Sequence, residues 1–154
     1  IAAGFFFARA EWLRDVPFDP YLPWCFMGEE IALSVRAWTS GWDIYAPRQN
    51  VIAHQYRPGR LGLPKFWESV NQFWHQPGIS NQITALVLKR IKHMVHYPSA
   101  ETVEYPEDVL MELEHYSYGT ERSWEEYMEF AELHTDDVNL HCNKKSIHWC
   151  DHGL

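Results

Sequence analysis

The feature that most restricts the fold is a helical pattern that begins directly after a glycine, Gly28. Large apolar side chains recur with the i, i+4, i+7 spacing of one helix face, namely Ile31, Val35 and Trp38. Two adjacent carboxylates, Glu29 and Glu30, open the pattern, and Ser40-Gly41 closes it. The pattern therefore predicts an amphipathic helix with two acids in its first turn.

Strand-like apolar runs alternate with further helical patterns in the rest of the chain. The strand-like runs cover residues 1–10, 42–47 and 51–56, and the first is expected to be buried. Helical patterns cover residues 10–16, 65–74, 80–95, 106–116 and 123–133. Ser80 or Asn81 is expected to cap the third of these, and Ser123 with Glu126 predicts a capping box on the last. The alternation favours the α/β class.

Composition limits the classes of function. The formal net charge of −8 argues against a nucleic-acid-binding protein, because such proteins need a basic face. Much of the acid lies in residues 101–132, which predicts a solvated, partly helical face. No run is apolar for long enough to span a membrane. Three cysteines, an odd number, favour a reducing compartment such as the cytoplasm over the Golgi lumen.

Glu29 and Glu30 have two readings. Acids in a first helical turn stabilise the helix through its dipole, by some tenths of a kcal/mol. Carboxylates at the rim of an apolar pocket also suit hydroxyl binding or proton transfer. The apolar residues just before them, Trp24, Phe26 and Met27, favour such a pocket.

Histidines and arginines provide the remaining candidates. His54 ends a strand-like run and is either a structural histidine or a metal ligand. Arg57 and Arg60 follow it in a turn and could hold phosphate oxygens. The tail could bind zinc, although solvated side chains are the default reading, through His134, His141, Cys142, His148, Cys150 and His152.

Taken in order, these motifs resemble the C-terminal half of a GT-A glycosyltransferase domain. The stretch "AAGFFFARAEWLRDVPFDPYLPWCFMGEEIALSVRAWTSGWDIYAPRQNVIAHQYR" is similar to hydroxyproline N-acetylglucosaminyltransferases, as is "HYSYGTERSWEEYMEFA". Polypeptide N-acetylgalactosaminyltransferases resemble the chain more distantly. They share a tryptophan and a Gly-Glu before a Ser-x-Arg-x-Trp helix, then His-x-x-Arg, here Trp24, Gly28-Glu29, Ser34, Arg36, Trp38, His54 and Arg57.

The resemblance implies a role for each matching residue. Glu29 would contact hydroxyls of the donor sugar in UDP-GlcNAc, and Glu30 would lie near the hydroxyl of a protein acceptor, hydroxyproline among the candidates. His54 would bind Mn²⁺ or Mg²⁺, and Arg57 would stabilise the diphosphate with Arg60 beside it. The donor would also pass beside four further residues, namely Ala3, Gly4, Trp24 and Gly28.

One part of the GT-A pattern is missing. No Asp-x-Asp metal motif stands in a suitable place, so it is expected upstream of Ile1 together with the uridine-binding half. Residues 1–97 would then be the C-terminal part of the catalytic domain, and residues 98–154 an acidic, mostly helical segment of the same domain. Such a fragment is expected to be inactive alone. The alternative is a carbohydrate- or protein-binding module without catalysis. The enzyme hypothesis further expects His54 and the two glutamates to converge on one cavity.

Overall fold

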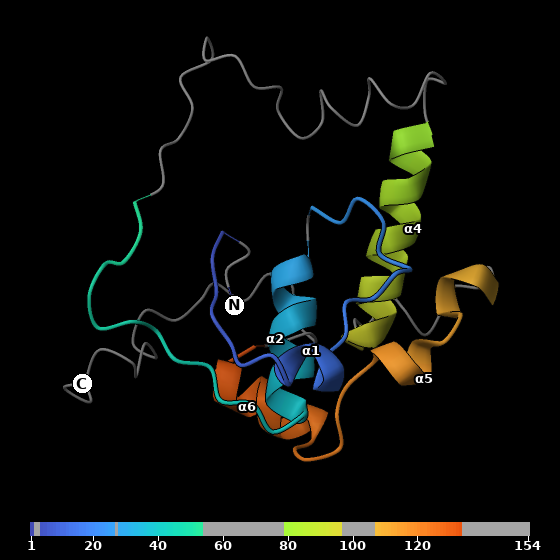
Figure 1. The fold of residues 1–154 in the computed structure, drawn as a ribbon. Coiled ribbons are helices and arrows are strands. Elements are labelled where there is room, and N and C mark those ends of the chain that lie inside the picture. The colour runs from blue at the N-terminus through green and yellow to red at the C-terminus, as the bar shows by residue number, and fades with distance from the viewer. Residues whose placement is uncertain (2–3, 27, 54–78, 97–106, 134–154) are drawn as a thin grey trace, which may run out of the picture.

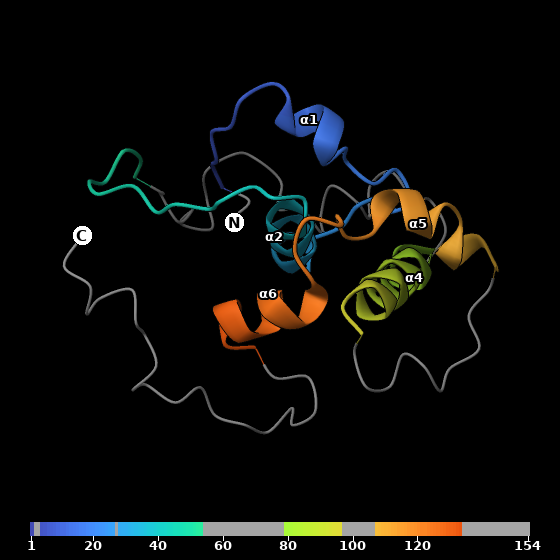
Figure 2. The ribbon, with the colours of Figure 1, turned by 90° about the horizontal axis from the view of Figure 1, so that it is seen from below.

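The computed structural model describes residues 1, 4–26, 28–53, 79–96 and 107–133. The described residues form α1 (Trp12–Asp15), α2 (Glu29–Thr39), α4 (Ile79–Met94), the 3-10 helix η1 (Glu107–Leu110), α5 (Leu113–Tyr116) and α6 (Trp124–Ala131), and the α-helices are labelled in Figure 1. α2 lies at the centre, beside α4 and above α6 (Figures 1 and 2). None of the helices described is long and apolar enough to cross a bilayer.

Helix α2 confirms the helix predicted from the apolar spacing. It starts after Gly28 and ends before Ser40, as the sequence signals indicate. Val35 and Trp38 are buried against Tyr127 of α6, and the partly buried Ile31 packs on the same cluster. Ala37, on the neighbouring face, is buried in a second cluster with Trp12 and Val16. The central helix is therefore covered by α1 on one side and by α6 on another.

Helix α4 contacts the start of α2 and confirms the third predicted helical pattern. Val87, Ile91 and Val95 form the buried stripe of α4, and Leu22, Cys25 and Ile31 pack against it. The helix begins at Ile79, so Ser80 and Asn81 lie within its first turn and the predicted cap at either residue is wrong. The buried stripe brings the loop before α2 into contact with α4.

The acidic C-terminal region packs back onto α2. Its helix α6 opens with the predicted capping box, in which Ser123 and Glu126 exchange side-chain-to-backbone hydrogen bonds. The predicted helix over residues 106–116 is instead divided into η1 and α5, because Glu112 adopts a left-handed conformation with φ 49°. Six glutamates of this region are exposed, as predicted for a solvated face: Glu112, Glu114, Glu121, Glu125, Glu126 and Glu129.

Two segments predicted as strands differ from the expectation. Residues 5–9 have no regular secondary structure and are exposed, with Phe5 at 60% and Phe7 at 92%, so the prediction of a buried strand is wrong for them. Residues 42–53 likewise form no ladder with other described residues, and only the bend at Arg48–Gln49 matches the predicted turn. A strand needs a neighbour for its backbone groups, and the described part of the chain offers neither segment one. The α/β class and the GT-A architecture therefore stay predictions.

Candidate functional site

Glycine is required at the start of α2 for two reasons. Gly28 has φ 93°, a left-handed conformation that side chains with a Cβ rarely adopt. A Cβ at this position would also lie 2.9 Å from Cδ1 of Ile91 on α4. The helix start is therefore pressed against α4, and this contact fixes where the following carboxylates begin.

The two carboxylates differ in their surroundings. Glu30 is exposed, and its carbonyl accepts a hydrogen bond from the Ser34 hydroxyl at 2.6 Å. Glu29 is half-buried, and its Oε2 atom is inaccessible to solvent and has no hydrogen-bond partner among the described residues. A buried acceptor of this kind costs about 1–3 kcal/mol unless something donates to it. At this helix start, Oε2 of Glu29 can therefore accept a hydrogen bond that no described residue donates.

The thiol of Cys25 lies beside Glu29. The pKa of Cys25 is raised to about 11, chiefly by burial and also by the carboxylates of Glu29 and Asp19, although a hydrogen bond from the backbone N–H of Glu29 acts in the opposite direction. The thiol is consequently neutral at physiological pH and is a poor nucleophile. The acids, rather than the cysteine, carry the chemistry available at this helix start.

The loop that leads to α2 contains a strained aromatic residue. Trp24 has φ 56°, which is uncommon for a bulky side chain and costs about 1–2 kcal/mol. It is 41% exposed and stands four residues before the helix cap. Strained residues concentrate at functional sites. The conformation is consistent with Trp24 as a wall of the donor pocket, a role that stays a prediction.

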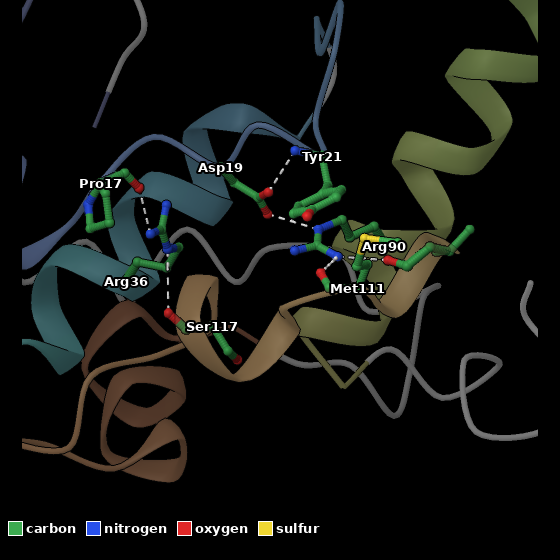
Figure 3. Close-up of polar contacts among 8 residues, drawn as sticks. Pro17, Asp19, Tyr21, Arg36, Arg90, Met111 and Ser117 are labelled. Atoms are coloured by element: carbon green, nitrogen blue, oxygen red, sulfur yellow. Dashed lines mark hydrogen bonds and ion pairs between the residues drawn. The ribbon is translucent and has the colours of Figure 1, made fainter. Parts of the chain in front are cut away.

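Two buried arginines hold the surroundings of the site (Figure 3). Arg90 of α4 pairs with Asp19 at 2.8 Å, and both side chains are 1% exposed. Its Nη1 donates to the carbonyls of Val109 and Met111 at 2.7 and 2.9 Å. The guanidinium also lies over the ring of Tyr21, 4.9 Å from its centroid. One side chain thus joins the loop before α2, helix α4 and the C-terminal region.

Arg36 makes a second connection of the same kind. From α2 it donates to the carbonyl of Pro17 at 2.6 Å and to that of Ser117 at 3.3 Å (Figure 3). The Ser-x-Arg-x-Trp pattern shared with the more distant transferase family is therefore structural in this chain. Ser34 bonds its own helix, Arg36 ties two loops, and Trp38 lies in the core.

An apolar pocket of about 220 Å³ lies between the loop, α4 and η1. Prolines and aliphatic side chains form most of its walls, which are completed by Tyr21, Arg90 and Asp108. It shares Val87 with the buried stripe of α4. The pocket is thus adjacent to the segment that carries Cys25 and Gly28.

Several predicted site residues lie outside the described residues, namely Ala3, His54, Arg57, Arg60 and the tail from His134 onward. The expected convergence of His54 with Glu29 and Glu30 therefore stays a prediction. Gly4 is exposed, and a Cβ there would meet nothing within 4 Å among the described atoms, so no close backbone approach is seen. The described residues contain no group of three or more His, Cys, Asp or Glu side chains that could hold a metal ion.

The sequence predicts neither the burial of Arg90 nor its ion pair with Asp19. The local pattern makes Arg90 one of several cations near a helix C-terminus, where they interact with the dipole. A signal was present, because Arg90 stands within the apolar stripe of α4, between Val87 and Ile91. A charged residue on an apolar face is rarely buried without a partner. Its partner, Asp19, is 71 residues away, and no local pattern identifies it.

Helix α2 thus begins on a left-handed glycine, and the Oε2 atom of its first glutamate has no hydrogen-bond partner within the described part of the chain. Comparison with protein families gives the class directly. The model described as Glycosyltransferase (GlcNAc) matches residues 1–137, and the chain belongs to this family. No curated protein and no solved structure matches the chain. The family assignment supports a glycosyltransferase role and suggests a nucleotide sugar as the partner.

Proposed function

We propose that the chain carries the sugar-facing and acceptor-facing part of a GT-A transferase that moves GlcNAc from UDP-GlcNAc to a protein hydroxyl. Hydroxyproline is the first acceptor to test. Glu29 would hold hydroxyls of the donor sugar, and Glu30, exposed one residue further on, would face the acceptor. Gly28 and Trp24 would line the donor side.

The observation that carries this proposal is the buried Oε2 of Glu29 without a hydrogen-bond partner among the described residues. An ionised carboxylate only accepts hydrogen bonds, and each sugar hydroxyl can donate one. Bonds to charged groups are stronger than those between neutral groups. Because Oε2 is inaccessible to solvent, a donor sugar at the start of α2 would have to displace the atoms that cover it, and a hydroxyl that donated to it would then relieve its desolvation cost.

The same carboxylate can serve the chemistry. As the bond from the sugar to UDP breaks, positive charge develops on the ring, and a fixed carboxylate nearby stabilises it. The neutral thiol of Cys25 adds no charge at this helix start, where the acids are Glu29 and Glu30. His54 would help to hold a Mn²⁺ or Mg²⁺ ion, whose positive charge would offset that of the departing diphosphate. The described residues do not form that metal site, and the roles of Glu29 and Glu30 do not depend on it.

The test compares Glu29→Gln with wild type in the longest natural polypeptide that contains this chain. UDP release from UDP-GlcNAc is measured with and without acceptor peptides, and with Mn²⁺ or a chelator. Loss of the charge is expected to lower kcat/KM by about 10²–10³, by analogy with removal of a single electrostatic contact in other active sites. The midpoint of thermal unfolding should stay the same or rise, because an unpartnered buried charge is removed.

Glu114→Gln is the matched control, since Glu114 is an exposed acid on α5 away from the proposed site. It is expected to leave UDP release unchanged. If Glu29→Gln retains activity within about threefold of wild type, the role of Glu29 is wrong. If wild type binds UDP-GlcNAc but releases no UDP with any acceptor, the module without catalysis replaces the enzyme.

A further inference from the structure

We propose that Asp19 is a positioning residue of the transfer site. Together with Arg90 it fixes the described part of the loop before α2, residues 20–26 and 28, and through that loop the carboxylate of Glu29. This role rests on the proposed function of Glu29 and adds a residue that touches no substrate. It depends on an ion pair whose two members are far apart in the sequence.

The ion pair is a fixed point in the described part of the chain. Arg90 and Asp19 are each 1% exposed at the side chain, and their closest atoms, Nε and Oδ2, are 2.8 Å apart. Two backbone carbonyls, those of Val109 and Met111, accept from the same guanidinium. Because Arg90 is held from several directions, it can hold Asp19 in turn. Figure 3 shows Asp19 extending toward Arg90 from the loop.

Asp19 uses its second oxygen on its own loop. Oδ1 accepts from the backbone N–H of Tyr21 at 2.9 Å, and the Asp19 carbonyl accepts from the N–H of Leu22 at 3.2 Å. This arrangement is an Asx-type turn, which sets the direction in which the chain leaves Asp19. The Tyr21 ring then packs beneath the guanidinium of Arg90. One carboxylate therefore fixes both the position and the direction of the loop.

The far end of the loop rests on the same turn of α4. Gly28, at this end of the loop, lies against Ile91, which is the residue after Arg90. Between Asp19 and Gly28, the loop residues Leu22 and Cys25 pack on the buried stripe of α4 that contains Ile91. Cys25 lies close enough to both carboxylates that Asp19 and Glu29 each act on its thiol. Displacement of Asp19 would thus move a short, docked segment that ends at Glu29. A shift of about 1 Å in a catalytic group can lower a rate about 100-fold.

A role in stability alone would also make Asp19 sensitive to substitution, so the experiment must separate the two. A double-mutant cycle does this, because residues that act through one another give non-additive effects. If Asp19 works by placing Glu29, then its loss has little further effect once Glu29 is absent. If Asp19 only stabilises the fold, its loss leaves the kcat/KM of the folded protein unchanged. If Asp19 affects the site independently of Glu29, the two losses multiply.

The cycle uses Asp19→Asn, Glu29→Gln and the double variant in the longest natural polypeptide that contains this chain. The Asn amide oxygen can still accept from Tyr21, so the turn is kept while the charge is lost. All proteins are assayed below the onset of thermal unfolding by UDP release from UDP-GlcNAc. We expect Asp19→Asn to lower kcat/KM about 10- to 100-fold in the wild-type background and less than about threefold in the Glu29→Gln background.

Two further variants complete the design. Asp43→Asn breaks the Arg122–Asp43 pair, which has a similar length of 2.7 Å but an Asp43 side chain that is 57% exposed, and its kcat/KM should stay within about twofold of wild type. Asp19→Glu keeps the charge, and it should regain part of the activity lost in Asp19→Asn. If Asp19→Asn fails to fold, Arg90→Lys takes its place in the cycle.

The outcomes separate the positioning role from the proposed function. The positioning role would be overturned if the effects of the two substitutions multiply, or if the Asp19→Asn enzyme is as active as wild type. Either result would leave the proposed role of Glu29 unchanged. A Glu29→Gln enzyme as active as wild type would instead remove the proposed function on which the cycle rests. The positioning role is supported if the Asp19 and Arg90 variants lower kcat/KM when Glu29 is present and do not lower it further in the Glu29→Gln background.

Discussion

The two ends of helix α2 are built in opposite ways. At the C-terminal end the carbonyl of Thr39 accepts from the N–H groups of Glu121 and Arg122, at 3.0 and 3.2 Å. The Thr39 hydroxyl accepts from the N–H of Gly119 at 2.9 Å. At the N-terminal end Gly28 offers no side-chain cap, and Glu29 keeps a buried oxygen without a partner among the described residues.

The difference separates stability from binding capacity. A helix end whose orphan backbone groups are all paired is stable but has nothing left for a ligand. An end that buries an unpaired acceptor is less stable, and the cost is recovered only when a ligand donates to it. The closed end of α2 therefore anchors the fold, and the open end is where a sugar would bind. Substitutions at the two ends should consequently affect different measurements.

The largest expected effect is at the closed end, from Gly119→Ala. A Cβ on Gly119 would lie 2.4 Å from Cα of Ser40, a backbone atom that cannot move alone. Overpacking of this kind is expected to lower the free energy of unfolding by about 3 kcal/mol, measured by urea denaturation. The folded fraction should keep the wild-type kcat/KM, because the open end is untouched.

Gly4→Ala is the matched control for stability. A Cβ on Gly4 meets no described atom within 4 Å, so the free energy of unfolding should change by less than about 0.5 kcal/mol. If Gly119→Ala and Gly4→Ala are equally stable, then the closed end is not the anchor of α2.

The next effect in size is at the open end, from Gly28→Ala. The left-handed φ of 93° and the 2.9 Å approach to Ile91 are together expected to lower the free energy of unfolding by about 2 kcal/mol. Unlike Gly119→Ala, this change should also lower kcat/KM of the folded protein, by about tenfold or more, because it displaces Glu29. Urea denaturation and UDP release on the same samples check both numbers.

Equal activities of the folded Gly28→Ala and Gly119→Ala proteins would contradict the contrast between the two ends. The pair is well matched, since each variant adds one methyl group to a glycine beside α2. Any difference in kcat/KM between the two variants is therefore due to which end of α2 is changed and not to the size of the added group.

The sequence predicted those features whose signals are local. The stripe of Ile31, Val35 and Trp38 indicated α2, and the Ser123 and Glu126 pair indicated the start of α6, because each depends on residues within one or two turns. The acids after Gly28 were found for the same reason. What a local pattern could not give is that Glu29 keeps a buried unpaired oxygen while Glu30 is exposed.

Features that depend on distant partners were missed or predicted wrongly. Arg36 and Arg90 bind carbonyls and a carboxylate far away in sequence, so their burial is visible only in the folded chain. The apolar run at residues 4–8 was predicted to be buried, but burial of a strand depends on neighbours that its own sequence does not specify. Glu112 interrupts a predicted helix because Arg90 holds the carbonyl of Met111 just before it.

A smaller effect is expected at the closed end from Thr39→Val. The substitution keeps the shape of the side chain but removes the acceptor for the N–H of Gly119 and the donor to the Val35 carbonyl. Leaving a buried N–H unpaired should lower the free energy of unfolding by about 1.5 kcal/mol in urea denaturation. Thr39→Ser, which keeps the hydroxyl, should lose less than half as much, and equal losses would assign the effect to packing.

The smallest effect is expected at the open end, from the thiol of Cys25 at alkaline pH. Burial raises its pKa to about 11, above the value of about 8.5 in an unfolded chain. The neutral thiol therefore stabilises the fold fully below about pH 8.5, and this contribution disappears as the pH rises toward 11. Because Cys25 is only partly buried, the loss is discounted to about 1 kcal/mol.

Cys25→Ala isolates this contribution from those of Tyr21, Tyr118 and Tyr127, whose pKa values burial also raises and which are present in both proteins. The free energy of unfolding of wild type should fall more steeply between pH 9 and 11 than that of Cys25→Ala. The difference in thiolate absorbance between the two proteins should give a midpoint near 11. A midpoint below about 8.5 would mean that the open end stabilises a thiolate, and Cys25 would then join Glu29 as a reactive group at the start of α2.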